Sequence, residues 1–367
     1  MRVLFAGGGT GGHLYPGLAI ARAIVCLDPR VRPHFVGALR GVERDVLPQT
    51  EFPHDLLDLH PLYRQRPWEN WKTVRGAVGA WRRIGRLAAA ERPRLVVGTG
   101  GYASGLALAY ARLRGVPYVL QEQNSHAGLT TRFFAPGSRA VYLGFPEAAA
   151  GLRKGSRTEF VDSGNPIEPP PRDASQPAAR AAARERWGFP ERDGRVLLVF
   201  GGSQGARALN EAMSAWVGRG LPEGLRVIWA TGRGNFERFG HLEGERVRVR
   251  PYLSPIAEAY AASDLALARA GAMGTAELCA WGLPQILVPL PTAAADHQTK
   301  NADALATAGA AIVVGQAELT AERLDSVVRG LLGDSAALGR MAERARARAR
   351  PNAAEDIARH ALKLIGA

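Results

Sequence analysis

Two glycine-rich loops in this chain stand where an anion could bind. The first, GGGTGGH at residues 7–13, follows the apolar run 3–6, and the second, GGSQGA at residues 201–206, follows the apolar run 196–200. A strand, a glycine turn and a helix start form an anion-binding unit, because exposed backbone N–H groups and the helix dipole both favour negative charge. Two such units about half a chain apart predict two nucleotide-binding-like domains.

His13 is the candidate base, since it closes the first loop immediately before a helix-like stretch. The positive end of a helix favours the neutral imidazole, which can accept a proton. The alternative is that His13 only caps the loop. Gly7, Gly9 and Gly12 also fit the dinucleotide pattern G-x-G-x-x-G, but the next strand, at residues 35–39, ends without the acid that would hold a ribose.

Further glycines and polar residues follow later strands of the first half. A third glycine cluster, residues 98–105, comes after the strand-like run 95–97, and Gln121, Glu122, Gln123 and Asn124 come directly after the run 116–120. Four adjacent polar side chains are poor core material, so we expect them to hydrogen-bond a polyhydroxylated ligand. Glu122 is either a base or a structural partner of a backbone amide.

The second half offers a loop of small residues at positions 269–277, with a helix expected from about Met273. A diphosphate would suit that helix N-terminus. Glu277 could hold both hydroxyls of a ribose, or be an ordinary acid in a first helical turn. Asp296, His297 and Gln298 open another helix and offer polar groups to a sugar. No third ligand accompanies the acid and the histidine, so we expect no metal site.

Strand-like and helix-like segments alternate along the chain, which predicts an α/β fold of parallel sheets with helices on both faces. We expect a helix over residues 15–26, and strands over residues 1–6, 34–37, 95–98, 116–120, 141–143, 196–200, 226–230, 247–249, 265–268, 285–288 and 311–314. A proline-rich stretch after residue 164 reads as a linker. The expected domains are residues 1–163 and 164–340, with a helical segment at 341–367 returning to the first.

Composition narrows the class of protein. The chain has 367 residues, which favours two domains, and its two cysteines exclude a disulfide scaffold. No segment resembles a signal peptide or reaches the roughly 18–20 apolar residues that span a bilayer. The 47 basic and 34 acidic residues give a net charge of +13. This surplus favours anionic partners, or alternatively reflects genome composition.

One segment combines tryptophans with arginines. Between residues 63 and 86, Trp71, Val74, Val78 and Trp81 recur at helical spacing, and Trp68, Lys72 and several arginines flank them. Such a stripe is typical of a helix that lies on an anionic membrane surface. The alternative is a stripe that packs on the sheet.

The ordered set of motifs resembles one family, the MurG N-acetylglucosaminyltransferases. The matching segments lie at residues 8–13, 100–102, 122–124, 164–166, 201–206 and 271–277, and they span nearly the whole chain. The resemblance implies a GT-B fold, with two Rossmann-like domains facing across a cleft. It implies inverting transfer of N-acetylglucosamine from UDP-N-acetylglucosamine to the 4-hydroxyl of N-acetylmuramoyl-pentapeptide pyrophosphoryl-undecaprenol (lipid I). It also implies no cofactor, and peripheral attachment to the cytoplasmic face of the bacterial inner membrane.

The same resemblance implies roles for individual residues. The donor would be held by Thr10, Gly11, Gly12, Asn124, Ser203, Tyr252, Leu253, Ala272, Met273, Gly274, Glu277 and Gln298, and the acceptor by Gly9, Thr10, His13 and Tyr102. His13 is the first candidate for the base and Glu122 the second. The sequence departs from the family at Gln121, Ala270 and Glu168, and the last departure weakens a phosphate contact there.

Four other functions compete with this interpretation. A nonenzymatic sensor of this fold would carry the same motifs. A UDP-N-acetylglucosamine 2-epimerase of similar build would bind the donor without a lipid acceptor, and the tryptophan–arginine segment argues against it. An NAD-dependent oxidoreductase would need an acidic residue at the end of the second strand to hold the ribose, and this chain has none there. A nucleic-acid-binding protein would use the positive charge, but the chain carries no recognised motif for it.

Overall fold

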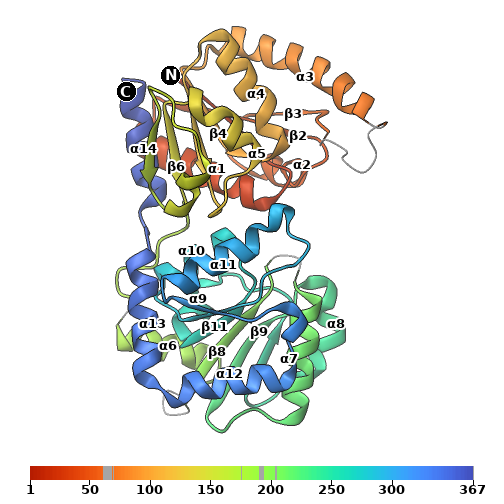
Figure 1. Cartoon of the computed structure of the whole chain (residues 1–367), viewed down its shortest axis with the longest axis vertical. Helices are drawn as coiled ribbons and strands as arrows, with labels where there is room; N and C mark the ends of the chain where they lie inside the picture. The colour runs from red at the N-terminus through yellow and green to blue at the C-terminus, as the bar shows by residue number, and fades with distance from the viewer. Residues whose placement is uncertain (61–67, 69, 175, 190–193, 203–204, 367) are drawn as a thin grey trace. The chain divides into compact units, whose positions relative to one another are not determined.

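The computed structural model describes the chain except residues 61–67, 69, 175, 190–193, 203–204 and 367, and the side chains of residues 70, 72 and 74. The chain forms two compact units (Figure 1). Unit 1 comprises Met1–Ile167 and Asn352–Ala367, and unit 2 comprises Glu168–Pro351. No helix within the described residues is long and apolar enough to cross a membrane.

Unit 1 is built on a seven-stranded parallel sheet in the order β3-β2-β1-β4-β5-β6-β7. Its strands are β1 (Arg2–Gly7), β2 (Arg32–Ala38), β3 (His54–Leu57), β4 (Leu95–Gly100), β5 (Tyr118–Glu122), β6 (Ala140–Leu143) and β7 (Glu159–Asp162). The central strands are almost wholly apolar because helices cover both faces of the sheet.

Helices α1 (Gly11–Leu27) and α14 (Ala353–Leu364) cover one face of this sheet, and α3 (Asn70–Glu91) and α4 (Gly101–Arg114) cover the other. Two shorter helices, α2 (Glu43–Val46) and α5 (Leu129–Phe134), lie in connections. α14 packs beside α1 and buries Ile357 and Leu362 in the core. The Tyr142 hydroxyl, 3.1 Å from His360 Nδ1, ties α14 to β6.

Unit 2 repeats the arrangement with six parallel strands in the order β10-β9-β8-β11-β12-β13. They are β8 (Arg195–Phe200), β9 (Leu225–Ala230), β10 (Val247–Arg250), β11 (Leu265–Ala268), β12 (Gln285–Leu287) and β13 (Ala311–Val313). One face packs against α7 (Arg207–Arg219), α12 (Ala321–Gly333) and α13 (Ser335–Arg348), and the other against α6 (Pro177–Arg186), α9 (Ala257–Ala262) and α10 (Ala272–Ala280). α8 (Phe236–Phe239) and α11 (His297–Thr307) complete the unit.

Each sheet reverses its strand order beside its first strand, β1 in unit 1 and β8 in unit 2. Open α/β sheets bind ligands at the carboxyl ends of the strands at such a point. The register places Gly7 beside Gly100 in unit 1, and Phe200 beside Ala268 in unit 2. The glycine loops after these strands therefore begin side by side within each unit.

The expected strands are confirmed, with ends that differ by at most two residues. The expected helix at residues 15–26 begins earlier, at Gly11, because the glycine loop itself supplies its first turn. β3 and β7 were not expected from the sequence. They are the two edge strands of the first sheet, and their short, mixed sequences HDLL and EFVD lack the apolar run of a buried strand.

Candidate functional site

His13, the candidate base, lies at the switch point of unit 1. It lies in the first turn of α1, and its Nδ1 is 2.9 Å from Gln123 Oε1. Gln123 donates from Nε2 to the carbonyl oxygens of Thr99 (2.8 Å) and Gln121 (3.1 Å), which turns its Oε1 toward the imidazole. Since an amide oxygen only accepts, His13 Nδ1 must carry the proton. The lone pair of the neutral ring is therefore on Nε2.

Two glycines make room for this imidazole. Gly100 and Gly101 connect β4 to α4 with φ of +97° and +74°. A Cβ on Gly100 would lie 3.0 Å from His13 Nδ1, and a Cβ on Gly101 would lie 2.1 Å from the carbonyl oxygen of Gly8. Thr99 Oγ1 also donates to the His13 carbonyl oxygen at 2.7 Å. The glycine cluster at residues 98–105 thus leaves the space that the imidazole of His13 occupies.

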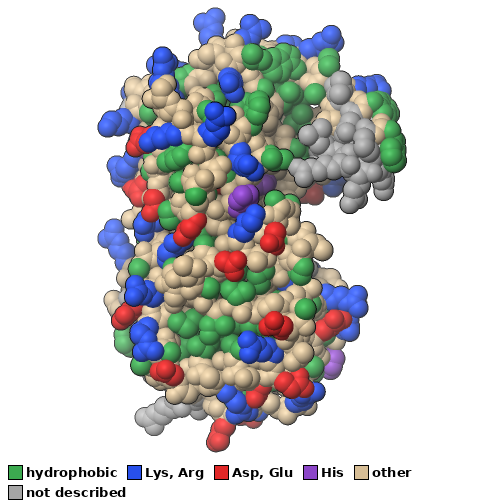
Figure 2. All heavy atoms as spheres, in the orientation of Figure 1, with side chains coloured by type: hydrophobic (Ala, Val, Ile, Leu, Met, Phe, Trp, Pro, Cys, Tyr) green, Lys and Arg blue, Asp and Glu red, His purple; other side chains and the backbone are tan. Residues whose placement is uncertain are grey.

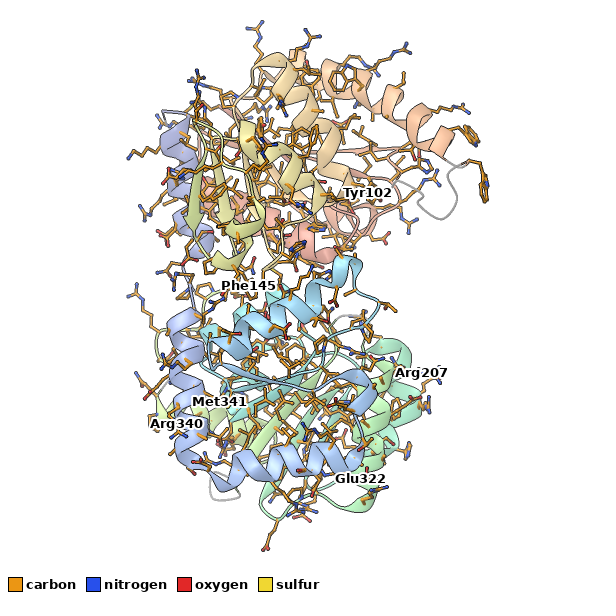
Figure 3. All side chains as sticks on the ribbon, in the orientation of Figure 1. Tyr102, Phe145, Arg207, Glu322, Arg340 and Met341 are labelled. Atoms are coloured by element: carbon orange, nitrogen blue, oxygen red, sulfur yellow. The ribbon has the colours of Figure 1, made fainter. Side chains whose placement is uncertain are left out.

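Tyr102, near the start of α4 (Figure 3), lies against the first glycine loop. A Cβ on Gly9 would come within 2.8 Å of its ring. Thr10 and Gly12 are exposed, whereas Gly9, Gly11 and His13 are half-buried. The residues expected to bind the acceptor therefore share one small area of unit 1.

The polar run after β5 is mostly internal. Gln121, Glu122 and Gln123 are at most 3% exposed, and only Asn124 is half-buried. Gln121 Nε2 donates to Asn165 Oδ1 at 3.1 Å. The expectation that all four side chains face a ligand is wrong for Gln121 and Gln123, because their amides form an internal network that holds His13.

Both carboxylate oxygens of Glu122 accept hydrogen bonds from backbone amides. Oε1 accepts from Asn124 N (3.1 Å), and Oε2 accepts from Gly128 N (3.0 Å). This geometry is that of the structural alternative, in which Glu122 fixes the loop between β5 and α5.

Sequence reasoning missed Glu43, a fully buried acid beside the first glycine loop. Its Oε1 accepts from Gly9 N (2.9 Å) and from Ala38 N (3.1 Å). Glu43 stands five residues beyond Ala38, on α2, so a search at the strand tip does not find it. Gly8, Gly37 and Gly41 surround its side chain, and a Cβ on any of them would collide with it. Glu43 therefore fixes the loop by occupying the Gly9 N–H.

In unit 2, the helix after β11 begins directly after a loop of small residues. α10 begins at Ala272 after Gly271, and its first turn, all of it described, holds no acidic side chain. The N-terminus of such a helix suits an anion. Glu277 is the sixth residue of α10, so the alternative that it is a first-turn acid is wrong.

Glu277 is half-buried and bonded to a tyrosine. The Tyr260 hydroxyl donates to Glu277 Oε2 at 2.6 Å. Burial raises the pKa of Glu277, the Tyr260 hydrogen bond lowers it, and the negative charge of Glu168 raises it further, with a net rise. Burial also raises the pKa of Tyr260. The tyrosine therefore remains a donor, and Oε1 of Glu277 accepts from no described residue.

The remaining donor candidates lie on loops of unit 2. Tyr252 is 48% exposed and stacks under the Arg233 guanidinium, 5.4 Å from the ring centre, whereas Leu253 is buried. Gln298 Oε1 accepts from Leu290 N at 3.0 Å, so this side chain fastens the loop after β12. Ser203 lies outside the described residues.

Sequence reasoning also passed over Arg269, at the end of β11. Its Nη1 donates to the carbonyl oxygens of Val288 (3.0 Å) and Pro289 (3.1 Å), and its Nη2 donates to Gln316 Oε1 (2.6 Å). Burial lowers the pKa of this arginine. Arg269 thus holds together the loops at the carboxyl edge of the sheet.

Comparisons with known proteins cover both units. Residues 3–143 match the glycosyltransferase family 28 N-terminal domain, and residues 196–357 match the glycosyltransferase family 28 C-terminal domain. A protein of Salinibacter ruber named UDP-N-acetylglucosamine–N-acetylmuramyl-(pentapeptide) pyrophosphoryl-undecaprenol N-acetylglucosamine transferase is 42% identical, over 99% of this chain and 96% of its own. A protein of the same name from Moorella thermoacetica is 40% identical, over 100% and 99%.

Solved structures agree with these matches. The crystal structure of Acinetobacter baumannii MurG superposes with a TM-score of 0.77 at 28% identity, and the alignment covers 99% of both chains. A UDP-N-acetylglucosamine 2-epimerase superposes with a TM-score of 0.64 at 15% identity, over 100% of this chain and 97% of that one. At that identity the second likeness extends to the fold alone.

Proposed function

Because the chain belongs to glycosyltransferase family 28, and within it to the N-acetylglucosaminyltransferases that form lipid II, we propose that its two units divide the reaction between them. The enzyme transfers N-acetylglucosamine from UDP-N-acetylglucosamine to N-acetylmuramyl-(pentapeptide) pyrophosphoryl-undecaprenol, a step of peptidoglycan synthesis. In the proposal, unit 2 binds the donor, and unit 1 binds the acceptor and supplies the base.

The proposed chemistry is a direct displacement at the anomeric carbon of the donor sugar. The acceptor's 4-hydroxyl oxygen forms the new bond to that carbon, and the bond to the diphosphate oxygen breaks with inversion. The hydroxyl proton passes to the base, and UDP leaves with the bonding electron pair. The enzyme must therefore supply a proton acceptor and stabilise the charge of the departing diphosphate.

We assign the base to His13. The observation that carries this assignment is its hydrogen bond to Gln123, which holds the proton on Nδ1 and leaves the Nε2 lone pair for the acceptor hydroxyl. Glu122, the second candidate, is assigned a structural role because both of its oxygens already bind backbone amides. Gly9, Thr10 and Tyr102 complete the proposed acceptor area.

We assign the donor chiefly to the carboxyl edge of unit 2. The N-terminus of α10, at Ala272, Met273 and Gly274, would stabilise the diphosphate through the helix dipole. Glu277, with Oε1 available, would accept from the ribose hydroxyls. Tyr252 and Leu253 would border the uracil. Sugar contacts would come from Gln298, Ser203 and Asn124, with Thr10, Gly11 and Gly12.

The base assignment is tested by replacing His13. We expect His13→Ala to lower kcat by about 10²–10⁴-fold with little change in the KM for UDP-N-acetylglucosamine, because general-base catalysis contributes about that much. UDP release with a short-chain lipid I analogue measures it. His241→Ala, at an exposed position in unit 2, is the control. Turnover of His13→Ala within a few-fold of the parent would refute the assignment.

The same assay separates transfer from epimerisation. UDP release that depends on the lipid analogue is the expected result. Formation of N-acetylmannosamine without the analogue would instead support the epimerase alternative, which has only fold similarity in its favour.

We also propose that α3 and Trp68, which stands two residues before it, touch the cytoplasmic face of the plasma membrane, where a lipid-linked acceptor resides. Trp68 is 72% exposed and Trp71 is 58% exposed. Figure 2 shows hydrophobic side chains gathered at this end of α3, with Lys and Arg side chains near them. Trp81 instead packs edge-on against Tyr110 of α4, so the far end of the predicted stripe faces the protein.

Vesicle binding tests this proposal. We expect the double variant Trp68→Ser, Trp71→Ser to bind phosphatidylglycerol vesicles at least about tenfold more weakly, since each tryptophan loses apolar burial in the interface. Leu113→Ser removes a side chain of similar exposure, 73%, from α4 and is the control. Equal vesicle binding by the parent protein, the double tryptophan variant and Leu113→Ser would contradict membrane contact by α3.

A further inference from the structure

A cavity of about 600 Å³ opens at the other edge of the sheet of unit 2. Its lining includes Arg195, Asp264 and Pro284, which stand at the amino ends of β8, β11 and β12. The residues assigned to the donor follow the carboxyl ends of these strands. Even the four-residue β11 separates the two edges by about 13 Å. The cavity therefore opens at the opposite edge of the sheet from the proposed donor site, although Tyr260, which lines it, donates to Glu277 of that site.

Positive charge is in excess on the wall of this cavity. Asp264 Oδ1 accepts from Arg180 and from Arg195 (2.9 Å), and Oδ2 accepts from Arg184 (2.5 Å) and from the backbone amide of Val196 (2.7 Å). Three guanidinium groups thus share one carboxylate, and the charged side chains that line the cavity are three arginines, Arg180, Arg195 and Arg346, and the single acid Asp264.

Only one of these three arginines makes contacts that give it a structural role in the unit. Arg184 is buried and also donates to the carbonyl oxygens of Ala262 and Gly194, so it is part of the frame of the unit. Arg180 and Arg195 line the cavity and keep 39% and 44% of their side chains exposed. Arg346, a third arginine of the lining, forms no ion pair with any described carboxylate.

The rest of the lining is largely apolar. Tyr260 and Trp281 lie with their ring centres 5.8 Å apart, and Leu283 and Leu338 are nearly buried beside the opening. α13, on which Figure 3 labels Arg340 and Met341, contributes one wall. Trp281 is half-buried, so part of its ring can contact a ligand. A cavity with guanidinium groups at one end and an aromatic wall beside them is suited to a ligand that carries both an anionic group and an aromatic ring.

We propose that this cavity binds an organic anion, in which a phosphate or carboxylate is carried on an aromatic body. The anionic group contacts Arg180, Arg195 and Arg346, and the aromatic body lies against Trp281. Pro170, Pro171 and Pro351 also line the cavity, and they belong to the two segments in which the chain enters and leaves unit 2. A bound anion would therefore contact both connecting segments.

Gly339 allows a test with a matched pair of variants. It lies on the wall formed by α13, is exposed, and a Cβ built on it meets no atom within 4 Å. Gly339→Glu adds a negative charge beside the arginines, and Gly339→Gln adds the same bulk without charge. Isothermal titration of the full chain with phenyl phosphate measures binding. We expect Gly339→Glu to bind at least about fivefold more weakly than Gly339→Gln.

Arg195→Gln provides an independent variant, and we expect it to weaken phenyl phosphate binding about fivefold as well. Inorganic phosphate, which has the charge without the aromatic body, should bind more weakly than phenyl phosphate. Tyr252→Ala, at the proposed uracil position, should leave phenyl phosphate binding in place, which separates this site from the donor site. Equal affinities of the two Gly339 variants, or loss of phenyl phosphate binding in Tyr252→Ala, would overturn the proposal. Neither result would bear on glycosyl transfer.

Discussion

At the scale of single residues, the Tyr260–Glu277 pair governs how the proposed donor site responds to pH. Burial raises the pKa of Glu277, and the hydrogen bond from Tyr260 opposes that rise. Only the ionised carboxylate is a full acceptor for two ribose hydroxyls. Donor affinity should therefore fall as the pH decreases through the raised pKa.

Two substitutions should shift this acid limb in opposite directions. Tyr260→Phe removes the hydrogen bond that lowers the pKa of Glu277, so the limb of kcat/KM for UDP-N-acetylglucosamine should shift to higher pH. Glu168→Gln removes a negative charge that raises this pKa, so the limb should shift to lower pH. Steady-state kinetics from pH 5 to 8 measure both. Shifts in the same direction would show that Glu277 does not control donor binding.

The sequence indicates candidate site residues but not the residues that hold them in place. The types and loop positions of His13 and Glu277 mark them as candidates. Gln123, which fixes the His13 tautomer, lies 110 residues away, and Glu43 lies 34 residues from the Gly9 amide that it binds. Such pairs depend on strand order and helix placement, which a single sequence does not specify. For the same reason the sequence suggested a ligand role for Gln121 and Gln123, which are buried.

At the scale of elements, the turn from β4 to α4 sets the position of the first glycine loop. Gly101 has a left-handed φ of +74°, and its Cα lies close to the carbonyl of Gly8 and to the ring of His13. Any side chain at this position both strains the backbone and displaces the β1–α1 loop.

Alanine substitutions at Gly101 and at Gly105, both in α4, should distinguish a crowded glycine from one with open space around it. We expect Gly101→Ala to lower the free energy of unfolding by about 1–3 kcal/mol and to reduce kcat by at least about tenfold. Gly105→Ala, where a Cβ meets nothing within 4 Å, should leave kcat unchanged and stabilise the protein by up to about 1 kcal/mol. Chemical denaturation and the UDP-release assay measure the two quantities. Unchanged kcat in Gly101→Ala would contradict the seating of His13 by this turn.

Strands with an apolar or alternating sequence are predictable, including the edge strands β10 and β13 of unit 2, whereas the short polar edge strands of unit 1 are not. The interior strands of both sheets carry continuous apolar runs because helices cover both of their faces. The edge strands β3 and β7 have one free side and carry polar residues, and they were missed. The first glycine loop was predicted as an anion site, and in the structure its Gly8 makes room for the Glu43 side chain, while Gly100 and Gly101 of the third cluster make room for His13 and the loop.

At the scale of the whole molecule, unit 1 is completed by a distant segment of chain. α14 follows all of unit 2 in the sequence, yet Ile357, Ala358, Ala361, Leu362 and Ile365 are buried in the core formed by α1 and the first sheet. The amphipathic face of α14 therefore contributes to the stability of a unit whose other helices and strands all precede position 168.

Truncation of one buried side chain should show this dependence. We expect Ile357→Ala to destabilise unit 1 by about 2–5 kcal/mol, since the residue is 1% exposed. Arg359→Ala, an exposed position on the same helix, should change stability by less than about 0.5 kcal/mol. Hydrogen–deuterium exchange should show faster exchange in β1 and α1, with β8 unchanged. Faster exchange confined to unit 2 would contradict this assignment of α14.

The return of α14 to unit 1 also has a consequence for biosynthesis. A ribosome makes residues 1–167 first, but that nascent unit lacks part of its core until residues 352–367 have emerged. Unit 2, which is continuous in sequence, can finish folding earlier, so the usual N-terminal-first order is reversed. Until residues 352–367 emerge, the apolar surface of α1 that α14 covers remains exposed. The nascent chain is most in need of a chaperone during this time.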